Sequence, residues 1–555
     1  MRIDSQTGMW KFASWVLLLV GVTVAVAAYL QALHYPFVND DTVYIVENTK
    51  LAGLQFTELW RLFIEPFNRY EFLPLRDLSY WLDITLFGLT PAAFRAHNII
   101  LYLFCLPLVY VTTLGLWRYF RPADAASAPL AAKAATVLFA LHPSHVEAVV
   151  WISGRKDVLS TLFSLFALWF AMNSKREHGL SPGYAIATLV ALLAAMLSKA
   201  TTVALAPVIA LLWIHFWQDI PKPDRNRNVL LWPFASLILA ACIVLVFSAN
   251  STVKATAYFG IEVATRALAV LGWLARLAVS PENRYFIYPV FDDPYLAVMV
   301  TIGTVILLTA IAGAALILRK RTLEGFVLIA FVLLCLPYTQ LVPFVTYTLV
   351  SDRFLILASW PAVLLIVALS WRLKNWSRLV LLLALVLTWG YQTIERPRDW
   401  RSYESLMDAD LRAYPGNYLP AFQKIMSYLL PKGRFYEAGV MAESINVPEA
   451  RAIMQLLVQG AIDLRDVAKT RDPRDAEKHL QDLGVLLKAP PIQYKWNPAM
   501  THFWEESQDS FELEWQWLVK NFPDDVEVRE SAKASMVSVR KKIYECKVSL
   551  MSCTQ

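Results

Sequence analysis

The sequence predicts an all-α integral membrane protein with about eleven transmembrane helices, followed by a soluble helical domain at the C-terminal end. The 555 residues are 57% hydrophobic and only 17% charged. The apolar residues come in repeated blocks of about 20, the length that crosses a bilayer as a helix, which a soluble core does not need. After residue 394 these blocks stop and charged residues become frequent.

The first predicted crossing is the uncharged run Phe12–Leu30. Arg2 and Lys11 precede it, which places the N-terminus in the cytoplasm by the positive-inside rule. The run lacks a small-residue cleavage site, so we expect a retained helix rather than a signal peptide. The first extracytoplasmic loop then spans residues 34–93, with helical patches expected to lie along the membrane surface.

Ten further crossings follow, with clusters such as Arg118 and Arg121 on the cytoplasmic side. Thr265–Ser280 is apolar, but counting it as a span would place Arg319 and its two cationic neighbours outside. We therefore predict a juxtamembrane or re-entrant helix there. The predicted spans are Phe94–Trp117, Ala134–Val150, Val158–Asn173, Gly183–Leu197, Thr201–Trp217, Val229–Ala249, Tyr295–Leu318, Gly325–Phe344, Phe354–Trp371 and Leu379–Ile394.

The composition changes abruptly at Glu395. Residues 1–394 are therefore predicted to form a polytopic membrane domain, and residues 395–555 a soluble, helical, extracytoplasmic domain. The stretch from Pro420 to Ala438 looks like one degenerate tetratricopeptide helical pair, without a clear second copy. Whether Cys546 and Cys553 form a disulfide is left open by the sequence.

Charge and motifs exclude several classes of function. The net charge of +6 is modest and fits cationic cytoplasmic loops, so no nucleic-acid partner is expected. The sequence contains no P-loop, dinucleotide fingerprint or Gly-x-Ser-x-Gly elbow, which argues against a nucleotide-driven pump and a serine hydrolase.

Two adjacent acids, Asp40 and Asp41, lie where the chain leaves the first helix. Neighbouring carboxylates at a hydrophobic boundary are costly, because each disfavours ionisation of the other. One of them is a candidate general base facing a membrane-bound substrate. The alternative is that both are solvated loop acids just beyond the helix end.

More polar residues gather on the same predicted side of the membrane. His142, His145 and Glu147 suggest a metal site, but their spacing matches no standard zinc motif. Packing and hydrogen bonding near the interface are the preferred roles for the histidines. Arg155 and Lys156 are placed either to bind a lipid-linked phosphate or to snorkel as ordinary interfacial cations.

Three further cations, Lys199, Arg284 and Arg353, lie at predicted outer boundaries of the membrane. Each is a weak signal alone, but together they can surround one anionic headgroup that the two acids face. A transporter more often has polar residues at the bilayer midplane and an inverted repeat. The one-sided distribution favours an enzyme at the outer leaflet.

Short stretches across roughly residues 30–400 form an ordered pattern that is more specific than any single piece. They are Phe37-Val-Asn-Asp-Asp41, Leu73-Pro-Leu75 with Ser79-Tyr80, Gly88-Leu-Thr-Pro91 with His97-Asn98, His142-Pro-Ser-His-Val-Glu147, Ser153-Gly-Arg-Lys-Asp157, Leu197-Ser-Lys-Ala200, Ser280-Pro281 with Tyr288-Pro289, and Ser351-Asp-Arg-Phe354. The pattern resembles the tetratricopeptide-repeat-containing protein O-mannosyltransferases and, more broadly, the GT-C glycosyltransferases. Two features depart from the family: Leu73 replaces a common Arg, and the C-terminal region has at most one recognisable repeat.

The resemblance implies a polyprenyl-phosphate sugar donor and transfer outside the cytoplasm. Asp40 becomes the favoured general base and Asp41 its partner, in a single displacement with inversion and the lipid phosphate as leaving group. The cations expected to offset charge on that phosphate are Arg155, Lys156, Lys199, Arg284 and Arg353. The candidates for the acceptor or sugar pocket are Arg76, which could substitute for the missing Arg, His142, His145 and Glu147.

The leading hypothesis is an enzyme that moves one sugar from a polyprenyl-phosphate carrier to a Ser or Thr hydroxyl of an exported protein. The expected location is a bacterial inner membrane, with the C-terminal domain in the periplasm. Sugar transfer to a glycolipid or polysaccharide is the alternative within enzymes. A non-catalytic assembly or transport protein is the alternative from another class. The need for a divalent cation is left open.

Overall fold

The computed structural model describes residues 2–68, 71–220, 227–250, 261–279, 285–288, 295–320, 322–339, 341, 348–415, 418–445, 448–470, 474–487 and 498–548. These residues are mostly helical, which confirms the predicted all-α class. The one sheet in this part of the chain is a hairpin of β1 (Lys175–Arg176) and β2 (Gly179–Leu180), paired antiparallel. It joins two apolar helices and makes no layer of its own.

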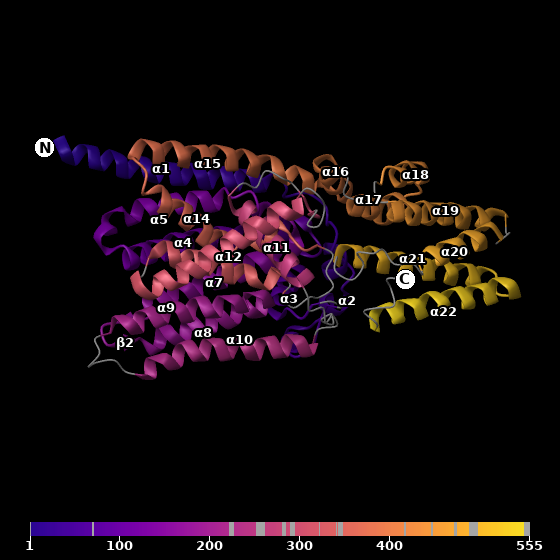
Figure 1. The fold of residues 1–555 in the computed structure, drawn as a ribbon, viewed down its shortest axis with the longest axis horizontal. Coiled ribbons are helices and arrows are strands. Elements are labelled where there is room, and N and C mark those ends of the chain that lie inside the picture. Colours follow the sequence, from indigo (N-terminus) through magenta and orange to yellow (C-terminus); the bar gives the residue numbers. More distant parts are fainter. Residues whose placement is uncertain are drawn as a thin grey trace.

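Long helices run side by side through the larger part of the molecule (Figure 1). The first, α1, packs against the last, α15, and both lie along one edge of the bundle. The helices of the bundle are α1 (Arg2–Leu30), α4 (Pro91–Phe120), α5 (Ala128–Ala140), α7 (Arg155–Asn173), α8 (Pro182–Ser198), α9 (Leu205–Asp219), α10 (Leu231–Asn250), α11 (Ile261–Val279), α12 (Tyr295–Lys320), α13 (Leu323–Cys335), α14 (Ser359–Ser370) and α15 (Asn375–Glu395).

Helix length and apolar composition support a membrane protein. Four described helical stretches are long and apolar enough to cross a bilayer: Pro91–Phe120, Ala200–Asp219, Tyr295–Ala314 and Asn375–Arg401. Five shorter apolar helices accompany them within the described residues: Ser14–Leu30, Pro182–Ser198, Leu231–Val246, Leu323–Thr339 and Ser359–Ser370. The count of eleven crossings stays a prediction.

One predicted span, Ala134–Val150, is wrong as a continuous helix. The chain forms α5 and then the short α6 (His145–Val150), with a turn at Pro143 between them. Proline lacks the N–H that would continue the hydrogen-bond ladder, and its ring clashes with the preceding turn. The break brings His145 and Glu147 into the site described below.

Helix α11 covers the region predicted as juxtamembrane or re-entrant. It packs along α12, and the two backbones meet at Gly272 and Gly303. A methyl group at either glycine would overlap the facing main chain, so only glycine permits this approach.

The first loop contains four short helices, and its own apolar core fixes it on the bundle. The sequence supplies clear ends for the longest of them, since α3 begins at Pro74 and ends before Gly88, whose φ is +64°. Apolar residues of the loop pack with Phe94 of α4 and Ile152. The helices are η1 (Thr42–Val46), α2 (Thr49–Ala52), η2 (Phe56–Phe63) and α3 (Pro74–Phe87).

The C-terminal helices lie at the same end of the bundle as α2 and α3 (Figure 1). The predicted helical pair is present as α17, η11 and α18, with a turn at Gly433, whose φ is +69°. The elements are η10 (Arg396–Arg401), α16 (Tyr403–Ala413), α17 (Tyr418–Lys424), η11 (Ile425–Leu429), α18 (Phe435–Glu443), α19 (Pro448–Thr470), α20 (Arg474–Leu487), α21 (Pro498–Asn521) and α22 (Val526–Val548).

Candidate functional site

The two adjacent acids of the first loop have different environments. Asp41 is fully buried, and its carboxylate accepts hydrogen bonds from the main chain of Val38 at 3.0 Å and of Ser153 at 2.8 Å. The Ser153 hydroxyl adds a third bond at 2.6 Å. Asp40 is partly exposed, and within the described part of the chain its carboxylate makes no hydrogen bond to a protein group. A turn with a left-handed residue, Asn39 (φ 56°), precedes the pair.

Burial raises the pKa of both carboxyl groups. For Asp41, loss of hydration outweighs its three hydrogen bonds and the nearby Arg95, and the pKa rises to about 6. For Asp40, burial also raises the pKa, while the positive charges of Lys156 and Arg353 oppose the shift. A carboxylate with a raised pKa that faces cations has the properties of a general base at neutral pH.

Glu71 joins two of the predicted site cations. Its carboxylate lies 2.6 Å from Nζ of Lys156 and 2.5 Å from the guanidinium of Arg76, which also binds Asp77. Burial works against the charge on Glu71, but the two cations outweigh it and hold the pKa at about 2. The charge on Glu71 also acts on Asp40, so these residues form one electrostatic cluster.

The other two described cations are paired in the same way. Lys199 pairs with Asp157 at the start of α7, and Arg353 with Glu147 on α6. Arg353 belongs to η9 (Asp352–Leu355), and its Nε has no hydrogen-bond partner among the described residues. A small cavity lies beside Asp157, and Thr161, Thr201 and Tyr338 are part of its lining.

Arg155, predicted to bind the donor phosphate, is surrounded by acceptors of the protein itself. Its guanidinium is fully buried and pairs with Asp83 at 2.5 Å. It also donates to Asn98 at 2.7 Å and to the main-chain carbonyl of Phe94 at 2.7 Å. All three of its nitrogens are thus occupied by the protein, and a phosphate would have to displace these acceptors. These contacts fit a structural role for Arg155, and its role as a phosphate ligand stays a prediction.

The two histidines are bound by protein groups. His145 exchanges hydrogen bonds with the hydroxyls of Tyr102 and Ser359, each at 2.8 Å, and its ring stacks on that of His142. Over the described ranges, no group of three or more His, Cys, Asp or Glu side chains is arranged to hold a metal ion. The contacts of His145 fit the packing and hydrogen-bonding role preferred from the sequence, and the roles of both histidines stay predictions.

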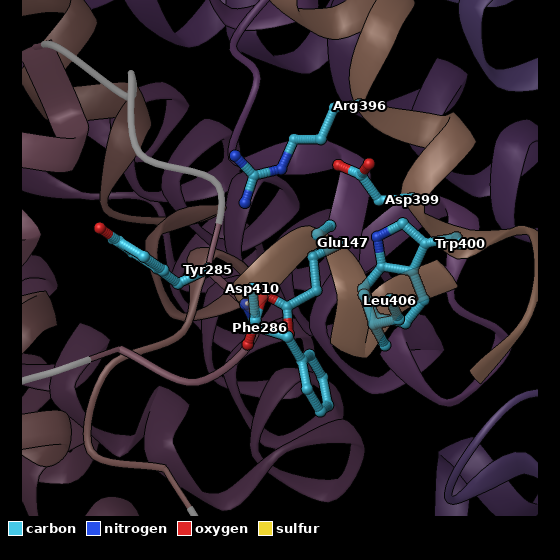
Figure 2. Close-up of a pocket in the computed structure, with 9 residues that line it drawn as sticks. Glu147, Tyr285, Phe286, Arg396, Asp399, Trp400, Leu406 and Asp410 are labelled. Atoms are coloured by element: carbon cyan, nitrogen blue, oxygen red, sulfur yellow. Dashed lines mark hydrogen bonds between the residues drawn. The ribbon is translucent and has the colours of Figure 1, made fainter. Parts of the chain in front are cut away.

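Figure 2 shows a pocket between α6, the segment at residues 285–288 and the start of the C-terminal helices. Its empty space is about 260 Å³. Charged groups from distant parts of the sequence meet there, together with aromatic rings. The lining residues are Glu147, Tyr285, Phe286, Arg396, Asp399, Trp400, Leu406, Ala409 and Asp410.

The positive charges of Lys156 and Arg353 therefore act on Asp40, and Glu71 joins Lys156 to Arg76. Lys199 is linked to this group through Asp157: it pairs with the Asp157 carboxylate, whose negative charge also acts on Arg353. Arg284 and Cys553 lie outside the described residues, as does the side chain of Cys546.

Sequence reasoning missed the carboxylates that pair with the cations. Glu71 and Asp157 were not singled out, nor was Ser153 as the group that binds Asp41. The available signal was weak: Glu71 stands just before Leu73-Pro-Leu75, and Ser153 and Asp157 lie within one of the motif stretches. A buried cation requires an acidic partner. A search of the sequence for acids near the motif stretches would therefore have identified Glu71 and Asp157 as candidates.

Curated proteins named protein O-mannosyl-transferases are similar to part of this chain. F38B6.6 of Caenorhabditis elegans is 31% identical over 158 residues, which cover 27% of this chain and 22% of that protein. TMTC1 of Homo sapiens is 29% identical over 223 residues (37% and 24%), and TMTC4 of Mus musculus is 28% identical over 218 residues (37% and 29%). These matches confirm the resemblance predicted from the motifs.

The matched part of the chain spans only about a quarter of the length of these relatives. No protein-family model matches the chain, and no solved structure matches it.

Proposed function

We propose that this chain is a membrane glycosyltransferase that moves one sugar from a polyprenyl-phosphate carrier to a Ser or Thr hydroxyl of an exported protein. The names of the similar proteins support a glycosyltransferase acting on protein, and they suggest mannose as the sugar. The observation that carries the proposal is the position of Asp40: its carboxylate has no hydrogen-bond partner among the described residues, and the positive charges of Lys156 and Arg353 act on it.

In the proposed reaction, Asp40 takes the proton of the acceptor hydroxyl. The oxygen forms a bond to the anomeric carbon as the bond between that carbon and the phosphate oxygen breaks, and the electron pair stays on the lipid phosphate. A single displacement of this kind inverts the configuration. Atoms and charge balance, since the proton ends on Asp40 and the negative charge on the phosphate.

Lys156, Lys199 and Arg353 are the described cations proposed to offset this charge, and Arg284 stays in the proposal from its sequence position. Positioned cations act most strongly where charge develops in the transition state. The Nε–H of Arg353 is buried and has no hydrogen-bond partner in the described part of the chain, and we propose that it donates to the phosphate.

Asp41 is proposed to hold the loop that presents Asp40, because its carboxylate is engaged by Val38 and Ser153. Arg76 is proposed to shape the pocket through Glu71, and His142, His145 and Glu147 to line or support the acceptor side. A divalent cation is not required by this scheme, and chelation during the transfer assay tests whether one takes part.

We propose the following architecture for the whole chain. A GT-C-type membrane domain covers residues 1–394, with about eleven crossings and the N-terminus in the cytoplasm. Residues 395–555 form a soluble periplasmic domain of a bacterial inner-membrane protein. A reporter fused after Glu395 should read as extracytoplasmic, and a cytoplasmic signal would overturn this topology.

The function is tested with the purified full-length protein, labelled polyprenyl-phosphate mannose and a peptide rich in Ser and Thr. The expected result is labelled peptide whose sugar is released by mild alkali, as for a link to Ser or Thr. Label appearing only in added glycolipid or polysaccharide would favour the alternative acceptor. If no carrier supports transfer and a partner complex survives purification, the assembly protein gains support.

A further inference from the structure

Asp352 and Arg353 are neighbours in η9, yet their side chains bind different parts of the chain. The Arg353 guanidinium pairs with Glu147, and the Arg353 main-chain N–H donates to the same carboxylate at 3.0 Å. Asp352 is fully buried, accepts a hydrogen bond from the Tyr288 hydroxyl at 2.6 Å and pairs with the guanidinium of Arg396. One short turn thus carries both a cation assigned to the donor phosphate and the carboxylate that binds Arg396.

Arg396 belongs to the segment that leads from the membrane helices to the C-terminal helices. It is the first residue of η10, directly after α15, and only 5% of its surface is exposed. A buried charge is strongly destabilising without its partner, so Arg396 and Asp352 depend on each other. Their contact connects the C-terminal segment to the turn that carries Arg353.

A second set of contacts also connects the C-terminal segment to the region around η9. Asp410 of α16 accepts hydrogen bonds from the main-chain N–H groups of Phe286 at 2.6 Å and Ile287 at 2.8 Å. The next residue, Tyr288, is the one that donates to Asp352. The segment at residues 285–288 is therefore fixed between α16 and η9.

Figure 2 shows Arg396 and Asp410 on the lining of the same pocket as Glu147, the partner of Arg353. The start of the C-terminal region thus binds Asp352 through Arg396 and also lies beside Glu147, the partner of Arg353. We propose that Arg396 is a positioning residue: through Asp352 it holds Arg353 in the orientation that binds the donor phosphate. This inference rests on the proposed function, and Arg396 itself does not touch the substrate.

The test measures steady-state transfer by the full-length protein, with polyprenyl-phosphate mannose as donor and a Ser- and Thr-rich peptide as acceptor. Arg353 acts on charge that builds as the bond to phosphate breaks. Arg396→Gln should therefore lower kcat roughly tenfold and leave the KM for the peptide within about twofold of wild type. Arg396→Lys keeps the charge and should recover part of kcat. Tyr288→Phe, which removes only one hydrogen bond to Asp352, should lower kcat by a smaller factor.

Arg398→Gln is the matched control, because it removes an Arg two residues further along η10. Arg398 is 48% exposed and pairs with Glu395 at 2.5 Å. Its kcat should equal that of wild type. An equal loss of kcat in Arg396→Gln and Arg398→Gln would overturn the inference, as would wild-type kcat in Arg396→Gln.

A double variant separates positioning from a general loss of stability. In an Arg353→Gln background, adding Arg396→Gln should lower kcat by less than about twofold, because the residue that it positions is already gone. The inference would be contradicted if the reduction of kcat in the double variant equalled the product of the reductions in Arg353→Gln and Arg396→Gln. If Arg396→Gln does not purify as a folded protein, Tyr288→Phe in both backgrounds decides the question in the same way. A wild-type protein without transfer, or wild-type transfer by Arg353→Gln, would instead overturn the proposed function.

Discussion

The hydroxyl of Ser153 donates a hydrogen bond to the Asp41 carboxylate at 2.6 Å, and the Ser153 main-chain N–H donates to the same oxygen at 2.8 Å. These bonds tie the first loop to the segment that precedes α7. They bind Asp41 in place, while its neighbour Asp40 stays partly exposed and faces the cations. Two acids that are adjacent in sequence thus have separate environments, and substitutions should separate their effects.

The first prediction concerns stability. Asp41→Ala leaves three donors of Val38 and Ser153 without their acceptor and should lower the free energy of unfolding by about 2–4 kcal/mol. Asp40→Ala removes no protein hydrogen bond and should change it by less than about 1 kcal/mol. Thermal unfolding of the detergent-solubilised protein measures both. Equal losses for the two variants would contradict the different environments of the two acids.

The second prediction concerns pH. The pKa of Asp41 is about 6 in the folded protein and near 3.8 as a free carboxyl, so the folded state binds the proton more tightly. Stability from this group is therefore full below pH 4, falls as the pH rises from about 4 to 6, and stays constant above that. The total change is up to about 3 kcal/mol.

Asp41→Asn cannot titrate and provides the control for this pH effect. The difference in melting temperature between wild type and Asp41→Asn should change across pH 4–6 and stay flat from pH 7 to 8. Glu71 acts in the opposite direction and in a lower range: its pKa is near 2 in the folded protein, so its contribution is lost only as the pH falls from about 4.5 to 2. A difference that stays flat across pH 4–6 would show that the Asp41 pKa is not raised.

The third prediction compares two glutamates of similar exposure. Glu71 and Glu65 have side chains that are 31% and 32% exposed. The partners of Glu71, Arg76 and Lys156, are buried, whereas Glu65 pairs with the more exposed Lys50 and Arg61. Glu71→Gln should cost about 1–3 kcal/mol of stability and Glu65→Gln less than about 1 kcal/mol.

The outcome is read from thermal unfolding at pH 7. If both variants lose the same small amount of stability, Glu71 does not hold the cation cluster together. A loss confined to Glu71→Gln supports the cluster, because burial of the partners is the main difference between the two sites.

The fourth prediction tests a structural role for Arg155 against the predicted role as a phosphate ligand. Arg155→Lys cannot replace the bonds to Asp83, Asn98 and Phe94 at once, and should lower stability by about 2–4 kcal/mol. Transfer per folded molecule should keep a KM for the donor within about twofold of wild type. A large rise in this KM without loss of stability would instead assign the donor phosphate to Arg155.

The helical architecture could be predicted from the sequence because a bilayer-length apolar block leaves few other structures. The predicted span Gly183–Leu197 differs from α8 by one residue at each end. The break at Pro143 was the main local error, since an apolar run masked the effect of proline on the helix.

The site was harder to predict, because its contacts join residues far apart in the chain. Glu71 and Lys156 are 85 positions apart, and Glu147 and Arg353 are 206 apart. Local patterns indicate where charges lie relative to the membrane, but they do not show which charges meet. Arg155 and Lys156 illustrate this limit: they are adjacent in sequence, yet Arg155 pairs with Asp83 and Lys156 with Glu71.

The most direct test of the central claim is the rate of mannose transfer by Asp40→Asn, measured beside wild type with saturating donor and peptide. Asn has nearly the shape of Asp but cannot accept the hydroxyl proton, so the rate should fall about 10²–10⁴-fold while the melting temperature stays close to that of wild type. Transfer at the wild-type rate by a folded Asp40→Asn protein would contradict the assignment of Asp40 as the general base.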